Sequence, residues 1–369
     1  MQKYSWKTKL STLFNFIKNI LLPGKAIRRA IIFLIVVIFM FSALLLNYSV
    51  SSIDKRNLTV DVDIPTGSSF LQVTEILNKA GLIKNHFLFY SLAIIKRANR
   101  NIRAGEYEFN TSITPWTMIN KLKRGEIKIY KVIVREDLSL RDIAAILDKD
   151  KLINKEIFFE LARDNEFLES LNIKAESIEG YIFPDTYYFD RSMNTHRIMK
   201  KMVDTFWKKV TPGMIKRAGD LGLSLHQFIT LSSLIGKESG NDSEKPKIAA
   251  VFYNRLKKGM RLQSDPTAVY DMDSFAGKVL RSHLKRKSLY NTYLIKGLPP
   301  GPIANPGLAS LKATLEPAHV DYLYFVSKKD GTHYFSSSLA EHNQAVNRYK
   351  NIKDEKIQEL EDKASDEEY

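Results

Sequence analysis

The sequence contains no cysteine among its 369 residues. Disulfide bonds, thiolate nucleophiles and cysteine-ligated metal sites are therefore excluded. Acidic residues are missing from residues 1–53, a stretch that carries seven Lys or Arg side chains. Hydrophobic residues make up 44% of the whole chain. A chain of this length and composition can bury a sizeable core, and we expect it to form two or three domains.

The chain is basic, with a formal net charge of +15, and strong basicity is a common sign of nucleic-acid binding. The distribution of charge argues against that partner. Outside residues 1–53, 49 basic residues stand against 41 acidic ones, and the last twenty residues carry eight acids and four lysines. This excess is mild. A basic body suits an anionic polymer or surface in general, but the charge distribution does not favour nucleic acid, and we expect none among the partners.

One long apolar run, residues 30–46, reads AIIFLIVVIFMFSALLL. Extended to residues 27–48, it has the ~20 residues that a helix needs to cross ~30 Å of hydrocarbon. Basic residues precede the run and the first acid, Asp54, follows it. The positive-inside rule therefore places residues 1–26 in the cytoplasm and the body outside the cytoplasmic (inner) membrane, in the periplasm or its equivalent.

The alternative reading of this run is a cleaved signal peptide. The long run, the basic leader of nearly thirty residues and the lack of a clear cleavage site favour an uncleaved, single-pass anchor. Residues 10–22 form a shorter and interrupted apolar stretch, which predicts at most an interfacial helix.

A 14-residue pattern recurs at residues 64–77, 109–122 and 134–147. Each copy joins a strand end to a polar turn and then to an amphipathic helix that begins at a Ser or Thr, a typical N-cap. Alternating residues at 59–64 and 127–134 predict the strands. We predict a small α+β region over residues 56–150 that resembles LysM-type glycan-binding modules. A plain spacer between membrane and body is the equal alternative.

The remainder reads as a mixed, mainly helical domain over residues 155–350, followed by an acidic tail at residues 351–369 that predicts a partly frayed helix. The fold class is therefore α+β with an N-terminal transmembrane helix. The aromatic segment EGYIFPDTYYF, residues 179–189, could line a sugar-binding cleft. Its composition favours an ordinary core.

The segment LHQFITLSSLIGKESG, residues 225–240, predicts a helix that ends with Gly240 as a left-handed C-cap. Glu238 lies seven, four and three residues after Leu231, Leu234 and Ile235, so it belongs to the apolar stripe. Burial and the negative end of the helix dipole should both raise its pKa. Such a carboxyl can serve as the acid of glycosidic cleavage. A glutamate that reaches solvent or pairs with Lys245 is at least as compatible with the periodicity.

A second helix is predicted over residues 244–258, and stiff polar segments follow it at residues 261–267, 290–293 and 297–307. The last of these, GLPPGPIANPG, has four prolines and three glycines. Rigid non-helical segments after a helix-borne acid can form the walls of a cleft. Surface connection is the alternative.

The motifs together resemble a known family in their order and spacing. They are EGYIFPDTYYF, KESG, VFYNRL, GMRLQSDPT, YNTY, GLPPGPIANPG, YLYFVS and HYFSSSLAEHN. This set is similar to the YceG-like endolytic murein transglycosylases, the MltG family, over nearly the whole chain. One departure is Gly236, since the family often has a glutamate two residues before the catalytic one. We interpret Gly236 as a tolerated variation.

The resemblance implies that Glu238 is the single catalytic residue and that Glu238-Ser239 matches the glutamate-serine pair of lysozyme-like lytic transglycosylases. It implies cleavage of the β-1,4 bond between MurNAc and GlcNAc within glycan strands, leaving 1,6-anhydroMurNAc ends and terminating nascent strands. No cofactor or metal ion is expected. The partners would be peptidoglycan strands and membrane-bound peptidoglycan synthases.

Candidates for orienting the substrate accompany that implication. They are Ser239, Gln263, Ser264, Asp265, Tyr293, Asn305 and His333. Asp265 is expected mainly to organise the loop of residues 263–267, and His333 is the type of lone histidine that is more often structural. Two rival functions remain open: a hydrolytic muramidase that uses Glu238 with Asp265, and a non-enzymatic glycan-binding scaffold of the cell-wall synthesis machinery.

Overall fold

The computed structural model describes residues 25–349 except 99, 101, 273 and 276. The chain divides after Lys128 into two compact units, here called the first unit and the second unit. The sequence predictions for residues 1–24, including the interfacial segment at residues 10–22, lie outside the described residues. The prediction for the acidic tail at residues 351–369 does so as well.

Helix α2, Lys25–Val50, contains the apolar run. Its stretch Ile27–Val50 has a mean hydropathy of 2.8. Only 6% of the most apolar 18 residues of this stretch is buried inside the protein. Length and composition are sufficient to cross a membrane, which agrees with the span predicted at residues 27–48. The last turns of α2 are different, because they contribute to the core of the first unit. Leu45 is buried in this core, and the partly buried Tyr48 packs against it.

The first unit pairs a two-stranded antiparallel sheet with three short helices. Strands β1 and β2 pair from Thr59↔Asn110 to Ile64↔Gly105. Side chains from both strands and all three helices form one core, in which Val73, Leu77 and Tyr107 are fully buried. The elements are β1 Thr59–Ile64, α3 Phe70–Lys79, α4 His86–Ile95, β2 Gly105–Asn110 and α5 Pro115–Arg124.

The hydroxyl N-caps that the repeated pattern predicts are confirmed at all three positions. Ser69, Thr114 and Ser139 each accept a hydrogen bond from the backbone N–H three residues later. These bonds satisfy donors that a helix leaves unpaired in its first turn.

The second unit is mainly helical, with two small antiparallel sheets, so the predicted α+β class is confirmed. Its early elements are β3 Tyr130–Val134, α6 Leu140–Lys149, α7 Lys155–Leu161, α8 Asn165–Ser170, β4 Asp185–Phe189, α9 Thr195–Lys209 and α10 Pro212–Asp220. The later ones are α11 Leu225–Glu238, α12 Lys245–Lys257, the 3-10 helix η1 Asp265–Ala268, α13 Arg281–Leu284, α14 Leu308–Leu315, β5 Tyr324–Ser327 and β6 His333–Ser336.

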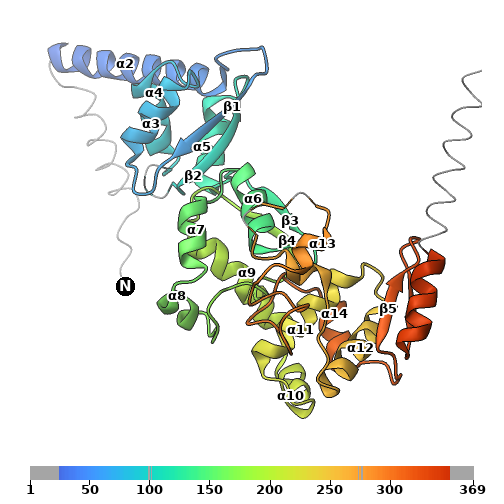
Figure 1. Ribbon diagram of the computed structural model, residues 1–369. Coiled ribbons are helices and arrows are strands. Elements are labelled where there is room, and N and C mark those ends of the chain that lie inside the picture. Colours follow the sequence, from blue (N-terminus) through green and yellow to red (C-terminus); the bar gives the residue numbers. More distant parts are fainter. Residues whose placement is uncertain (1–24, 99, 101, 273, 276, 350–369) are drawn as a thin grey trace, which may run out of the picture. The chain divides into compact units, whose positions relative to one another are not determined.

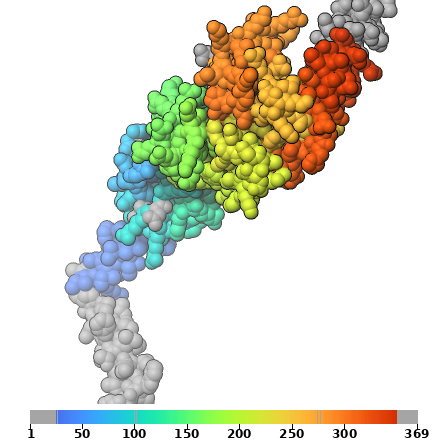
Figure 2. Space-filling view, turned by 60° about the horizontal axis from the view of Figure 1, so that its bottom comes forward, coloured from blue at the N-terminus to red at the C-terminus, as the bar shows by residue number. Residues whose placement is uncertain are grey.

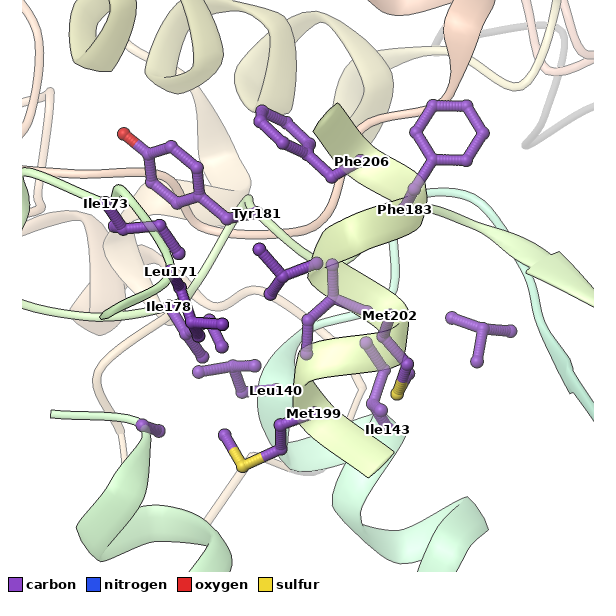
Figure 3. Close-up of a cluster of buried hydrophobic side chains, with 14 of the residues drawn as sticks. Leu140, Ile143, Leu171, Ile173, Ile178, Tyr181, Phe183, Met199, Met202 and Phe206 are labelled. Atoms are coloured by element: carbon purple, nitrogen blue, oxygen red, sulfur yellow. The ribbon is translucent and has the colours of Figure 1, made fainter. Parts of the chain in front are cut away.

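The third copy of the repeated pattern belongs to the second unit, which differs from the region predicted over residues 56–150. Strand β3 pairs with β4, from Tyr130↔Phe189 to Val134↔Asp185. Helix α6 contributes Leu140 and Ile143 to the core around α9, which also contains residues of the loop before β4 (Figure 3). The local pattern is the same in all three copies, but the partner of the strand is not a local property.

The aromatic segment before and within β4 is part of the same core. Tyr181, Phe183 and Tyr187 are buried, whereas Tyr188 faces solvent. Phe189 is fully buried as well, so the interpretation of this segment as core is confirmed for four of its five rings. In the space-filling view, residues around 280–300 (orange) and residues 320–349 (red) rise on either side of a notch in the second unit (Figure 2).

Candidate active site

Helix α11 runs through the middle of the second unit. It begins at the N-cap Ser224, which forms a capping box with Gln227. Every residue from Phe228 to Gly236 is buried. The predicted left-handed C-cap at Gly240 is wrong: the helix ends at Glu238, and Ser239 is extended with φ −145° and ψ 130°. The chain therefore turns away directly after Glu238, which leaves this carboxyl at the end of a buried helix.

Gly236 leaves room for the carboxyl group of Asp137. A Cβ atom at this position would lie 1.9 Å from Oδ1 of Asp137, far inside van der Waals contact. Asp137 is held by its own backbone N–H, which donates to the carbonyl of Asn305. Burial raises the pKa of the Asp137 carboxyl to about 6. This chain lacks the glutamate that the family often has at position 236. The Asp137 carboxyl, from the loop after β3, occupies the space beside Gly236.

Glu238 is partly exposed, although its helix neighbours Leu231, Leu234 and Ile235 are completely buried. The Ser264 hydroxyl donates a hydrogen bond to its Oε1. Burial raises the pKa of Glu238 to about 7, against the opposing effect of the Ser264 bond. The charge of Asp265 raises this pKa further. A carboxyl group in this state carries a proton near neutral pH and can still ionise.

The alternative pairing of Glu238 with Lys245 is not present. Nζ of Lys245 lies 2.7 Å from Oδ1 of Asp242 and 3.7 Å from Oε2 of Glu136. Lys237 is exposed and points away from the apolar stripe, and its Nζ donates to the Asp137 carbonyl.

Ser264 is held in place by a small network of hydroxyl groups. Its backbone N–H donates to Oγ1 of Thr292 at 2.9 Å, and its carbonyl accepts from Oγ1 of Thr267 at 2.6 Å. The two threonine hydroxyls lie 2.8 Å apart. Because all three side chains are buried, the Ser264 hydroxyl is directed at Glu238 by rigid surroundings.

Asp265 and Tyr293 form a second pair beside Glu238. The Tyr293 hydroxyl donates to Oδ1 of Asp265 at 2.5 Å. Burial and the Asp265 charge raise the pKa of Tyr293, so it stays a neutral donor. Arg255 is buried, binds the carbonyls of Leu262 and Leu323, and its positive charge acts to lower the pKa of Glu238.

A cavity of about 460 Å³ lies next to this cluster. Lys237 and Asp265, the chain neighbours of Glu238 and Ser264, both line it. Arg141 and Tyr270 line it too, and they also line a second cavity of about 540 Å³. The two cavities together could hold an extended polar ligand. Within the described part of the chain, no group of three or more His, Asp or Glu side chains is arranged to hold a metal ion.

The other candidates occupy different positions. Gln263 is exposed and adopts a left-handed conformation with φ +49°. Ser239 is buried, and its hydroxyl accepts from the Asn241 N–H at 3.0 Å, so it shapes the turn after α11. His333 contacts Glu244 through Nδ1 at 2.8 Å, and its backbone N–H donates to the same carboxyl, which ties β6 to the start of α12.

Asn305 does not reach the cleft. It is completely buried, and its Oδ1 accepts from the N–H groups of Gly180 and Ile182. Its Nδ2 donates to the Leu138 carbonyl and to Oε1 of Glu179. All the hydrogen-bonding capacity of this amide is used inside the protein, so the role predicted for it is corrected to a structural one.

Glu179 was missed by the sequence analysis. It is 3% exposed and accepts hydrogen bonds from the Leu140 N–H, the Tyr270 hydroxyl and the Asn305 amide. Burial raises its pKa to about 7. No spacing rule distinguishes it from an exposed glutamate, because its burial depends on three segments that are distant in sequence.

The chain is similar to known proteins over most of its length. A model of the YceG-like family matches residues 62–348. An endolytic murein transglycosylase of Bacillus subtilis is 37% identical over 319 residues, covering 81% of this chain and 87% of the relative. One from Streptococcus pneumoniae strain D39 is 27% identical, and the match spans 59% of that relative's length. The crystal structure of a yceG-like protein from Listeria monocytogenes matches with a TM-score of 0.55 and 33% identity, over 78% of this chain and 98% of that one. The resemblance seen in the motifs is thereby confirmed, and the chain belongs to the YceG-like family.

Proposed function

We propose that this protein is an endolytic peptidoglycan lytic transglycosylase with Glu238 as its acid and base. The observation that carries the proposal is the partly exposed carboxyl at the end of α11, with a pKa of about 7 and a buried hydroxyl network behind it. The relatives named endolytic murein transglycosylase support it.

The reaction needs one carboxyl group that acts twice. Protonated Glu238 gives its proton to the glycosidic oxygen as that oxygen leaves C1 of MurNAc. The resulting carboxylate takes the proton of the C6 hydroxyl of the same sugar, and O6 bonds to C1. The products are a free GlcNAc hydroxyl and a 1,6-anhydroMurNAc end, with Glu238 protonated again and no water consumed.

The position of Asp265 supports this mechanism over a hydrolytic muramidase. Its carboxylate accepts a hydrogen bond from the Tyr293 hydroxyl. This contact fits a residue that orients the loop and raises the pKa of Glu238, and it fits a nucleophile less well. We assign a different supporting role to Ser264, whose hydroxyl orients the Glu238 carboxyl and acts to lower its pKa. Exposed Gln263 is the residue that we propose to contact the sugar. Ser239 gives the site the glutamate-serine sequence of lysozyme-like enzymes, with a role in backbone geometry.

The first unit and α2 complete the proposal. We propose that α2 anchors the enzyme in the cytoplasmic membrane with residues 1–26 in the cytoplasm and both units outside. The paired strands and helices of the first unit support a LysM-like, glycan-binding role, and membrane-bound peptidoglycan synthases are the proposed partners. A reporter enzyme fused after Asp54 that is active only outside the cytoplasm tests the topology.

The decisive experiment is digestion of purified sacculi followed by mass measurement of the products. Wild type should release fragments with anhydro ends, and Glu238→Gln should release none. Glu169→Gln, at an exposed glutamate, is the matched control and should keep wild-type activity. Reducing ends would instead show a muramidase. A scaffold would release no product, and Glu238→Gln would keep full function in cells.

A further inference from the structure

Helix α2 belongs to the first unit, and α4 and α5 pack beside its C-terminal half (Figure 1). Phe41, Leu45 and Tyr48 are spaced four and three residues apart and so share that face. The Phe41 ring meets the ring of Phe87, at the start of α4, edge-on at 6.1 Å between centroids. The Tyr48 hydroxyl donates to the carbonyl of Asn85, the N-cap of α4, at 3.3 Å.

The depth of Phe41 in the membrane follows from the length of the apolar run in α2. Arg28 and Arg29 bound the apolar run on one side, and residues 30–46 span only about 25 Å as a helix. A hydrocarbon layer of ~30 Å therefore requires the whole run. Phe41 lies five residues before the end of that run, or about 7 Å inside it. Phe87, which packs on Phe41, must lie at a comparable depth.

Helix α4 has the composition of a helix at an interface. Its ten residues, HFLFYSLAII, include no Asp, Glu, Lys or Arg. Phe87, Ile94 and Ile95 are 68%, 49% and 64% exposed. Apolar side chains that lie together on a surface mark a contact site, and an interfacial helix buries such residues among lipid headgroups.

Cations and a tryptophan gather where α4 ends. Nζ of Lys96, the C-cap of α4, lies 3.3 Å from the ring centroid of the half-exposed Trp116. Lys123 donates to the Lys96 carbonyl at 3.0 Å. Burial and the neighbouring charges of Lys123 and Arg124 lower the pKa of Lys96. Tryptophan next to lysine is typical of membrane–water interfaces, and clustered cations attract anionic headgroups.

We propose that the first unit is itself seated in the extracytoplasmic interface of the cytoplasmic membrane, with Phe87, Ile94 and Ile95 among the lipid acyl chains and Lys96, Lys123 and Arg124 on anionic headgroups. The inference rests on the proposed crossing of the membrane by α2. It gives the first unit a lipid-binding surface in addition to any glycan-binding role.

Because the chain has no cysteine, single-cysteine variants of the full-length protein can be labelled without background. Phe87→Cys, Ile95→Cys, Leu71→Cys and Phe33→Cys each carry an environment-sensitive fluorophore. The proteins are reconstituted in vesicles of phosphatidylcholine and phosphatidylglycerol that contain lipids spin-labelled on the acyl chain. Leu71, 65% exposed on α3, is the matched apolar control, and Phe33 reports α2 itself.

Labels at Phe87 and Ile95 should be quenched severalfold more than the label at Leu71 and should resist quenching by iodide. Removing phosphatidylglycerol should reduce the quenching at Ile95. Equal quenching at Phe87, Ile95 and Leu71, with strong quenching at Phe33, would overturn the lipid-binding surface and leave the anchor intact. Absence of quenching at Phe33 would refute the membrane crossing and the lipid-binding surface together.

Discussion

Glu179 and Glu238 are both carboxyl groups whose pKa burial raises to about 7, but their surroundings differ. Glu179 is closed off from solvent and accepts hydrogen bonds from three separate segments. Glu238 accepts one hydroxyl and stays partly exposed beside a cavity. A raised pKa therefore does not identify a catalytic acid. Unfilled lone pairs and access for a ligand distinguish the two.

The largest expected effect is on activity at Glu238. Glu238→Gln removes both the proton donor and the base, so turnover on sacculi should fall by about 10³-fold or more. Its folding stability should be equal to or above that of wild type, because the amide avoids the buried charge. Product release is measured with thermal unfolding alongside. Substantial activity in the variant would transfer the catalytic role to another group.

Glu179 should show the opposite result. Glu179→Gln places an amide NH₂ among three donors, so the free energy of unfolding should fall by roughly 1–3 kcal/mol. Activity per folded molecule should change little. Denaturant unfolding and sacculus digestion on the same samples separate the two effects. If the variant is stable but inactive, Glu179 takes part in the reaction.

The loss at Glu179 should also depend on pH. Its pKa is raised in the folded protein, so its contribution to stability is full below its unfolded pKa of about 4.5. That contribution is lost as pH rises through about 7. Glu179→Gln should therefore cost more stability at pH 5 than at pH 7.5. An equal loss at both pH values would contradict the raised pKa.

Two variants beside Glu238 should move its pKa in opposite directions. Activity requires the protonated form and should fall as pH rises through about 7. Asp265→Asn removes a charge that raises this pKa, so the alkaline limb should move to lower pH. Ser264→Ala removes a hydrogen bond that lowers it, so the limb should move up. The pH dependence of kcat/KM measures both, and shifts of the same sign would contradict the assignment.

The smallest effect is expected at Tyr270, which donates to Glu179. Tyr270→Phe should lower stability by about 1 kcal/mol. Tyr290→Phe is the matched control: its ring lies 4.7 Å from the Tyr270 ring, and its hydroxyl has no hydrogen bond within the described residues. Equal losses from both variants would show that ring packing, and not the bond to Glu179, is responsible.

Much of this arrangement could be predicted from local patterns. The α11 stripe correctly predicted that Leu231, Leu234 and Ile235 are buried, although it left the environment of Glu238 open, and hydroxyl N-caps marked three helix starts correctly. Long-range pairing could not be predicted. The polar loop that contains Asn305 suggested a cleft wall, and its Ile303 does line the cavity beside Glu238. Asn305 itself is buried, and its amide joins this loop to two distant segments, at Leu138 and at residues 179–182. The Gly240 prediction failed because extended Ser239, not a left-handed glycine, ends α11.

The position of β3 and α6 determines at which residue a shortened form of the protein can begin. An expression fragment that begins at residue 151 would lack the strand that pairs with β4 and the Leu140 N–H that binds Glu179. Such a fragment would expose an edge strand and is expected to aggregate. A fragment that begins at residue 129 retains both contacts. A truncation, or a protease cleavage site introduced to release the enzyme from its anchor, therefore belongs before β3 rather than after the third repeat.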